Sequence, residues 1–423
     1  MKKVLLSSAL IAALLTSCGD STSDDDNTKV GALTVTPAAF TKTVDENALK
    51  GSEIGDLSVE IKDAGGVTHG LDFNHPDYSR TITITAENPA GAIEVSNIGT
   101  VTVKDASKFD YEANPSITAK VKIAYTAGSE EFSGTADVTI NLNNIMFKAV
   151  ENIPFSNYTT HAATVFKNQI VVSRPQKVWL SADGATWTAP TTNFANVSRH
   201  ETIVFNDSIW AIGGLLGGQM ITDGVYNSAD GKTWNNKGKV GLADEGRIGH
   251  KLVVHNDKLW LIGGTGKTGQ HNDVYYLEKG QQIWKQATAS ATFSARFYHQ
   301  VVSYKGKMWV IGGRDSQNNS LDEVWSSTDG ITWTAESASG LPKVAYHQIV
   351  ESNGKLWLLG GVIDTVLGSN SDKIYTSSDA ISWTEATGKV GFEGRVDHRA
   401  VVLNSKIWII GGNAGDGTVF TQE

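Results

Sequence analysis

The chain has 423 residues, of which 40% are hydrophobic and 19% are charged, and its formal net charge at pH 7 is −9. A chain of this length is too long for one ordinary core and predicts two or three domains, while its apolar content excludes a disordered protein. Because the chain is acidic and carries no basic cluster, we expect no nucleic-acid partner.

The N-terminus predicts an export signal, residues 1–17, rather than part of the fold. Two lysines precede an apolar run, Val4 to Leu15, that is too short to span a bilayer. The run ends in Leu-Thr-Ser-Cys, which resembles the bacterial lipobox, and the resemblance implies that Cys18 is lipidated and attaches the chain to a membrane. Glycine follows this single cysteine, which by analogy with sorting rules favours the outer membrane, facing the periplasm or the cell surface.

The next region predicts an all-β sandwich. Alternating apolar and polar residues recur there between turn-forming residues, which is the period-2 pattern of half-buried strands. Five to seven short strands in about 115 residues are typical of a sandwich domain. The clearest runs are 57–61, 81–85, 101–103, 117–124 and 138–140.

This region also resembles a cadherin-type repeat. Val-Asp-Glu-Asn at 44–47 is similar to the early acidic motif of that family, and Phe-Asp-Tyr-Glu at 109–112 is similar to its Leu-Asp-Tyr-Glu motif. Such repeats hold calcium on carboxylates, so the resemblance implies Glu46, Asp110 and Glu112 as ligands. The Asp-x-Asp motif of the family is absent, however, and a spacer without calcium is the alternative that we favour. No His/Cys cluster or nucleotide motif indicates another cofactor.

A repeat of nearly 50 residues dominates the rest of the chain. Five apolar runs end in Trp-x-Ile/Leu-Gly-Gly, and a histidine opens each of six units. This period with paired glycines resembles kelch repeats, and the resemblance implies a β-propeller whose blades are four-stranded antiparallel sheets. All twelve tryptophans fall on repeat positions, so we expect them to pack between blades. The five runs contain Trp210, Trp260, Trp309, Trp357 and Trp408, and the histidines are His161, His200, His250, His299, His347 and His398.

The ends of the repeat region predict six blades. The last unit stops after a third strand, 419–421, and an unexplained apolar run, 147–150, precedes the first unit. This run begins 14 residues before His161, just as Trp333 lies 14 residues before His347. We therefore expect the N-terminal strand to complete the last blade and leave no unpaired edge. The predicted organisation is a signal peptide (1–17), a tether (18–29), a cadherin-like sandwich (30–145) and a six-bladed kelch-type propeller (146–423).

Several units carry Ser-x-Asp-Gly-x-Thr-Trp or a close variant of it. The motif resembles the Asp-box of sialidase-like propellers. We expect its aspartates to cap the turn between the third and fourth strands by accepting backbone N–H bonds, rather than to act in catalysis. They are Asp183, Asp230, Asp329 and Asp379.

A ligand site is expected on the face where each blade begins and where the loops after the glycine pairs emerge. Arginine lies three residues before the histidine in three units, and an arginine ring would attract a carboxylate or an acidic glycan. Recurrence in several blades also suits a structural role, so residues that break the repeat are further candidates. The candidates are Arg247, Arg296, Arg395, Arg199, Arg314, Tyr298, Tyr346, Asp397 and His271.

Three functions remain open. The first, which we favour, is a lipid-anchored, non-catalytic module that binds a glycan or a protein. The second is a carbohydrate-active propeller, such as a kelch-type epimerase of sialic acid or a mutarotase, with its acid and base drawn from Glu201, Glu245, Asp397 and His271. Galactose-oxidase chemistry is excluded because no cysteine follows Cys18, and the glycine pairs match sialidases poorly. The third is a calcium-linked adhesin.

Overall fold

The computed structural model describes residues 31–46, 48–111, 113–150, 153–155, 159–363, 370–413 and 419–422. Within these ranges every element except one 3-10 turn, Ala106–Lys108, is a β-strand. The chain divides into two compact units, and the boundary between them in the sequence lies between Leu142 and Asn143. No described helix is long and apolar enough to cross a membrane. Cys18, the predicted lipidation site, lies outside the described residues.

The first unit has three small sheets around one core. Their strand orders are β1-β4-β5, β2-β10-β9-β6 and β3-β8-β7. The strands are β1 (Thr34–Pro37), β2 (Phe40–Asp45), β3 (Glu53–Asp56), β4 (Val59–Lys62), β5 (Thr68–His69), β6 (Ser79–Asn88), β7 (Ile93–Val95), β8 (Thr100–Val103), β9 (Ser116–Ala127) and β10 (Glu130–Asn143).

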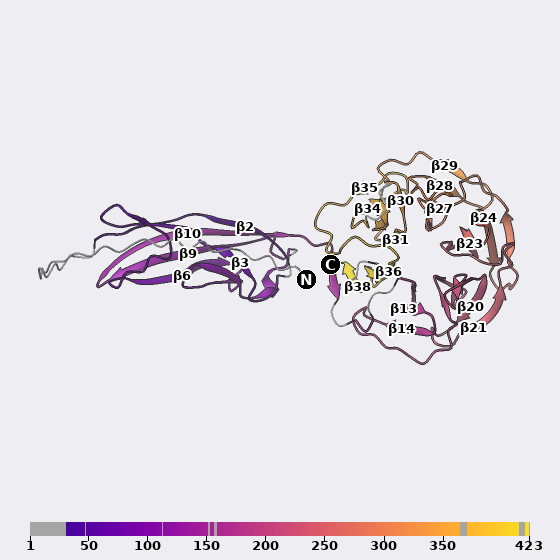
Figure 1. Ribbon diagram of the computed structural model, residues 1–423, viewed down its shortest axis with the longest axis horizontal. Coiled ribbons are helices and arrows are strands. Elements are labelled where there is room, and N and C mark those ends of the chain that lie inside the picture. Colours follow the sequence, from indigo (N-terminus) through magenta and orange to yellow (C-terminus); the bar gives the residue numbers. More distant parts are fainter. Residues whose placement is uncertain are drawn as a thin grey trace, which may run out of the picture. The chain divides into compact units, whose positions relative to one another are not determined.

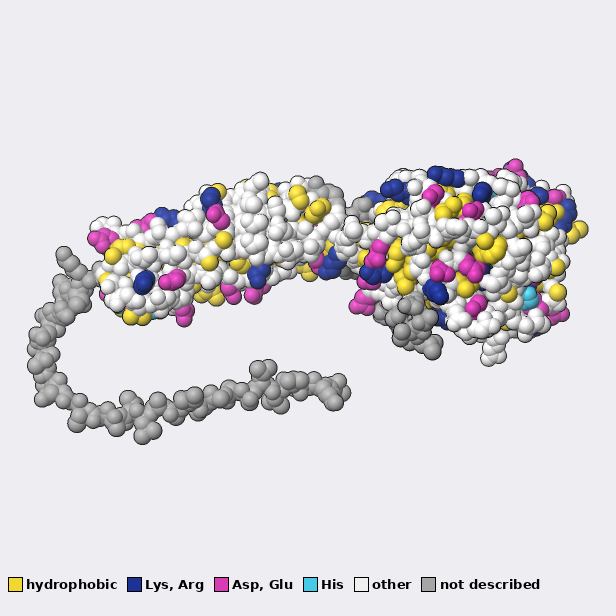
Figure 2. All heavy atoms as spheres, turned by 90° about the horizontal axis from the view of Figure 1, so that it is seen from above, with side chains coloured by type: hydrophobic (Ala, Val, Ile, Leu, Met, Phe, Trp, Pro, Cys, Tyr) yellow, Lys and Arg dark blue, Asp and Glu magenta, His cyan; other side chains and the backbone are white. Residues whose placement is uncertain are grey.

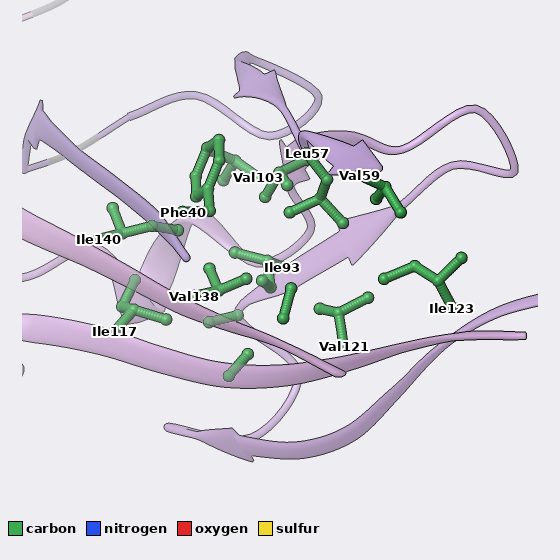
Figure 3. Close-up of a cluster of buried hydrophobic side chains, with 14 of the residues drawn as sticks. Phe40, Leu57, Val59, Ile93, Val103, Ile117, Val121, Ile123, Val138 and Ile140 are labelled. Atoms are coloured by element: carbon green, nitrogen blue, oxygen red, sulfur yellow. The ribbon is translucent and has the colours of Figure 1, made fainter. Parts of the chain in front are cut away.

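Alternation of side chains builds the core of this unit. In β9, Ala119 and Val121 are buried, whereas Lys120 between them is exposed and pairs with Asp137 of β10 at 2.6 Å. Successive side chains of a strand point to opposite faces, so one face of the β9–β10 pair is apolar and the other is charged. Figure 3 shows side chains of several strands meeting in this core.

The second unit is a propeller of six blades arranged in a ring (Figure 1). Blade 1 comprises β12 (Ala162–Phe166), β13 (Gln169–Arg174) and β14 (Lys177–Ser181); blade 2, β16 (Glu201–Phe205), β17 (Ser208–Ile212), β20 (Gly224–Ser228) and β21 (Asn235–Lys239); blade 3, β22 (Lys251–His255), β23 (Lys258–Gly266), β24 (Gly269–Glu278) and β25 (Lys285–Thr288). Blade 4 comprises β26 (Gln300–Tyr304), β27 (Lys307–Ile311), β28 (Val324–Ser327) and β29 (Thr334–Glu336), and blade 5 comprises β31 (Gln348–Ser352), β32 (Lys355–Leu359), β34 (Ile374–Ser377) and β35 (Thr384–Glu385). Blade 6 comprises β36 (Arg399–Leu403), β37 (Lys406–Ile410), β38 (Val419–Gln422) and β11 (Phe147–Val150).

Short strands lie in the connections between these blades. A three-stranded sheet joins the loop after the glycine pair of blade 2 to the segment before that blade, and a two-stranded sheet joins the corresponding parts of blade 5. A single bridge between Leu180 and Thr188 stands at the fourth-strand position of blade 1. The short strands are β15 (Val197–Ser198), β18 (Leu215–Leu216), β19 (Met220–Ile221), β30 (Val344–Ala345) and β33 (Val362–Ile363).

The ring is closed by the strand that the sequence predicted. β11 pairs antiparallel with β38, from Phe147 opposite Gln422 to Val150 opposite Val419. The Phe147 side chain is fully buried and meets Phe392 edge to face, with ring centroids 5.6 Å apart. The first and last strands of the repeat region therefore form one blade, and the six-blade prediction is confirmed.

The Asp-box turns also form as predicted. Asp230 Oδ1 accepts the backbone N–H groups of Lys232 and Thr233 at 2.8 and 2.7 Å. The same two bonds occur at Asp183, Asp329 and Asp379. These bonds favour the ionised carboxylate, and burial of the group opposes them. The pKa of Asp230 falls to about 2 as a result. The aspartates are thus turn caps rather than catalytic groups.

Exposed charged side chains of both signs occur in both units. Figure 2 shows acidic and basic side chains interspersed, among uncharged ones, on the face of each unit that it presents. The tryptophans, in contrast, are all buried or half-buried, as their repeat positions predicted.

Candidate functional site

The residue before the opening histidine has an unusual backbone in five blades. Its φ is positive at Arg199 (55°), Tyr298 (52°), Tyr346 (58°) and Asp397 (56°), and blade 3 has Gly249 there (63°). Large non-glycine residues seldom adopt this left-handed conformation, and they cluster at functional sites where they do.

The four side chains line one pocket at the centre of the ring. Backbone bonds join the blades here, because the N–H of Tyr298 donates to the carbonyl of Gly249 at 2.8 Å and the N–H of Tyr346 to that of Tyr298 at 3.0 Å. Beneath them lies the residue that follows each histidine in blades 2 to 6, namely Glu201, Lys251, Gln300, Gln348 and Arg399. We call this place the channel mouth.

The space inside the channel mouth is narrow. Its free volume is about 20 Å³, which is room for about one water molecule. A ligand larger than water must therefore rest on the side chains at the rim, and only a small group of it can enter.

Two stacked tyrosines form one side of the rim. The ring centroids of Tyr298 and Tyr346 lie 3.9 Å apart, and the Arg314 guanidinium lies 5.1 Å from the Tyr346 ring. Arg199 Nη1 donates a 2.8 Å hydrogen bond to the Tyr298 hydroxyl. Burial raises the pKa of both tyrosines, that of Tyr346 to about 12, so both phenols are neutral at physiological pH.

An ionic cluster lies below the rim. Glu201 accepts hydrogen bonds from Lys251 Nζ at 3.0 Å and from Arg399 Nη2 at 3.2 Å. Burial by itself raises the pKa of Glu201, but attraction to Arg399 and Lys251 outweighs it and lowers that pKa to about 2. Blade 1 has only Ala162 at the corresponding position, which leaves space for Arg399 of blade 6 to reach Glu201 of blade 2.

The channel mouth carries an excess of positive charge. Glu201 and Asp397 face four cationic side chains, namely Arg199, Lys251, Arg314 and Arg399. Burial raises the pKa of Asp397, and the attraction of Arg199 and Arg399 opposes this shift. A cationic centre in a chain of net charge −9 favours an anionic ligand.

Three predicted arginines do not line the channel mouth, which corrects the proposed arginine ring. Arg247, Arg296 and Arg395 are fully buried. Arg247 pairs with Asp244 and, at 2.6 Å, with Asp273; Arg296 donates to the Gly312 carbonyl at 3.0 Å and Arg395 to the Gly411 carbonyl at 2.9 Å. A glycine N–H of the preceding blade also donates to the backbone carbonyl of each arginine. Burial of an arginine requires internal partners, and these contacts tie adjacent blades together.

Two acid–base candidates lie outside the channel mouth. His271 Nε2 is 2.8 Å from Asp244 Oδ2 in the blade 3 cluster, and Glu245 pairs with Lys267 at 3.0 Å in an exposed position. The opening histidines are buried as well. Burial lowers the pKa of His200 and His347 to about 3, so these rings are neutral at physiological pH. Of the four candidates, the pocket brings together Glu201 and Asp397.

The residues predicted as calcium ligands have backbone partners in the first unit. Glu46 is buried and accepts the N–H of Tyr111 at 3.0 Å, and Asp110 accepts the N–H of Ala113 at 3.0 Å. Glu112 lies outside the described residues. The described residues contain no group of three or more metal-binding side chains. Calcium binding here stays a prediction.

Sequence reasoning missed Lys251 and Arg399 as residues of the channel mouth. The signal that could have found them is the position after each histidine, which reads Ala, Glu, Lys, Gln, Gln and Arg from blade 1 to blade 6. Strong variation at one position of a regular repeat marks a place where the blades are not interchangeable. Gln300 and Gln348 occupy the same position and bond the carbonyl of His347, at 2.6 and 3.1 Å.

Comparisons with known proteins agree with this architecture. Residues 160–361 match the KLHDC2/KLHL20/DRC7 Kelch-repeats domain, and residues 310–423 match the DUF6242 beta propeller domain. The solved structure titled "Structure of YjhT" is similar with a TM-score of 0.52 and 15% identity, over 65% of this chain and 95% of that one. No curated protein matches the chain. The second unit of this chain is therefore a kelch-type β-propeller.

Proposed function

We propose that the protein is an exported, lipid-anchored binding module whose propeller takes an acidic glycan, or another carboxylate-bearing ligand, at the channel mouth. The observation that carries this proposal is the convergence of Arg199, Tyr298, Tyr346 and Asp397 in one half-buried pocket. All four stand immediately before the opening histidine of their blade, and all four have a left-handed backbone.

The chemistry of the rim fits such a ligand. Arg199 offers a charged donor for a carboxylate, and the hydroxyl groups of the two tyrosines can donate and accept hydrogen bonds with sugar hydroxyls. Asp397 can accept from the ligand when it is ionised and donate when it is protonated. Because the pocket is too narrow for a sugar ring, the carboxylate is the part of the ligand that we place nearest to the cationic groups.

A second candidate, sugar epimerase or mutarotase activity, rests on Asp397. This carboxyl lies in the channel mouth beside Arg199, burial raises its pKa, and a carboxyl in such a place can serve as a general acid or base. An enzyme would consume or interconvert an acidic sugar that it binds, whereas a binding module leaves the sugar unchanged. Proton NMR of the anomeric and ring signals of the bound sugar over time separates the two functions.

Binding is expected to depend on Arg199. In the full chain carrying Cys18→Ser, we expect a glycan array to retain acidic glycans, and Arg199→Ala to weaken their affinity about 10- to 100-fold, because a charge-assisted hydrogen bond contributes about 1.5–3 kcal/mol. Titration calorimetry measures the loss. Lys232→Ala, which removes an exposed cation in an Asp-box turn, is the matched control and should bind normally. Equal retention of neutral and acidic glycans by both variants contradicts an anionic ligand, and retention of no glycan leaves a protein ligand.

Anchoring is expected to depend on Cys18. Wild-type protein produced in a Gram-negative host should incorporate labelled palmitate and sediment with outer membranes, because the lipobox cysteine is the attachment point of the lipid. Cys18→Ser should lose the label and become extractable without detergent. Labelling that persists in the variant would rule out this anchor.

A further inference from the structure

The propeller has a second pocket, between blades 2 and 3, at a place that is closed between blades 3 and 4 and between blades 6 and 1. In the closed blades, a small residue of the Asp-box turn packs on the second-strand tryptophan of the preceding blade. Gly330 of blade 4 is in close contact with Trp260 of blade 3, and Gly184 of blade 1 with Trp408 of blade 6. Both glycines have a φ of 74°, and the tryptophan rings leave no space for a side chain there. This contact seals the groove between two blades.

Blade 3 departs from the pattern at this turn. Leu277 occupies the position of the Asp-box serine, since it pairs with Leu259 as Ser228 pairs with Ile209. Trp284 lies seven positions after Leu277, whereas Trp234 lies six positions after Ser228. The turn reads Glu-Lys-Gly-Gln-Gln-Ile, without the capping serine and aspartate. The turn is therefore longer than the others and lacks the usual capping bonds.

A pocket takes the place of the missing contact. It has a free volume of about 160 Å³, against about 20 Å³ at the channel mouth. Trp210 and Trp284 line it, and Trp284 is half-buried because part of the ring packs on the cluster that contains Trp210 while the remainder faces the pocket. Ile283, beside Trp284, is 77% exposed. We call this place the blade 2/3 pocket.

Amide side chains supply the polar part of the lining. These amides form no hydrogen bond to any described residue of the protein, and each amide can both donate and accept. The charged lining is limited to Lys237, which is exposed. The amides belong to Asn206, Asn227, Gln281 and Gln282.

We propose that the blade 2/3 pocket is a second binding site, independent of the channel mouth, that takes the ring of a neutral sugar. A sugar ring has apolar C–H faces and a rim of hydroxyl groups that both donate and accept. Tryptophan surface matches the first property, and unpartnered amides match the second, as in other concave ligand sites. A phosphate or a carboxylate ligand would call for more positive charge than one exposed lysine supplies.

Binding of simple neutral sugars tests the proposal directly. The probes are the methyl glycosides of glucose, galactose, mannose and N-acetylglucosamine, added to the full chain carrying Cys18→Ser. Saturation-transfer NMR should show contact of the ring protons of at least one of them with the protein. Asn227→Ala and Gln282→Ala should each weaken its binding about three- to tenfold, which is the effect of losing one neutral hydrogen bond.

Two controls make the outcome decisive. Thr376→Ala alters the position in blade 5 that matches Asn227, since Thr376 pairs with Trp357 as Asn227 pairs with Trp210, and it should bind the sugar normally. Arg199→Ala should also bind it normally, which separates this site from the channel mouth. Unchanged melting temperatures show that the variants remain folded. Failure of all four glycosides to bind at millimolar concentrations, or binding that neither amide substitution weakens, overturns the proposal.

Discussion

Replacing Phe147 by alanine is expected to lower the free energy of unfolding of the propeller by about 3–5 kcal/mol, the usual cost of removing a buried phenylalanine. The side chain is fully buried in a cluster with Phe392 and Phe420. Its removal therefore leaves a cavity inside the cluster. The same residue begins the strand that closes the ring. Its loss should therefore weaken the contact between the two ends of the repeat region.

Differential scanning calorimetry is the appropriate measurement, because two compact units can unfold in separate transitions. The propeller transition should move to lower temperature in Phe147→Ala, while the transition of the first unit stays in place. Ala149→Ser, an exposed position of the same strand, is the matched control and should change stability by less than about 0.5 kcal/mol. If both variants melt like the wild type, β11 does not hold the ring closed.

The closing strand could be predicted because spacing alone identified it. A repeat with a constant period shows where a fourth strand belongs, and the run at 147–150 lies at the required distance from His161. The Asp-box turns could be predicted for a similar reason, because Asp230 and its equivalents act on N–H groups two and three residues away. Local chemistry of this kind is present in the sequence.

The direction in which a side chain points could not be predicted in this way, as the arginines show. Arg247 stands three residues before His250 and Arg199 directly before His200, and the first is buried in an ion-pair network whereas the second reaches the channel mouth. The position immediately before the histidine has a left-handed φ in blades 2 to 6, and the spacing in the sequence does not reveal that this position, rather than the one two residues earlier, lines the pocket. The pocket residues Lys251 and Arg399 were missed because they follow the histidines, where the pattern drew no attention.

The blade 2/3 pocket could be predicted in part. The broken Asp-box of blade 3 is visible in the sequence, as an extra residue before Trp284. The pocket that results is not visible in the sequence, because the missing contact is one between the turn at Gly280 and a tryptophan of another blade. Tertiary packing decides whether such a change leaves a pocket or is filled by a neighbour.

Glu201→Ala is expected to destabilise the propeller by about 3–5 kcal/mol, the usual cost of leaving a buried charge without its partner. The substitution removes the carboxylate that Lys251 and Arg399 share, and Lys251 is 8% exposed. Glu201 belongs to blade 2, Lys251 to blade 3 and Arg399 to blade 6, so the loss affects contacts across the channel rather than within one sheet. Glu385→Ala, which removes an exposed pair with Lys373, is the control and should cost less than about 0.5 kcal/mol.

The pH dependence of this loss provides a sharper test, because the pKa of Glu201 is lowered in the folded protein to about 2. A carboxyl whose folded pKa lies below its unfolded value, about 4.3, stabilises the fold fully above pH 4.3 and loses that contribution as the pH falls through 2. The stability difference between wild type and Glu201→Ala should therefore be constant from pH 7 to about pH 5 and shrink between pH 4 and pH 2. Urea unfolding at a series of pH values measures it. A difference that does not change with pH would show that Glu201 contributes by packing, and the cationic groups below the channel mouth would then have to be held in place by other means.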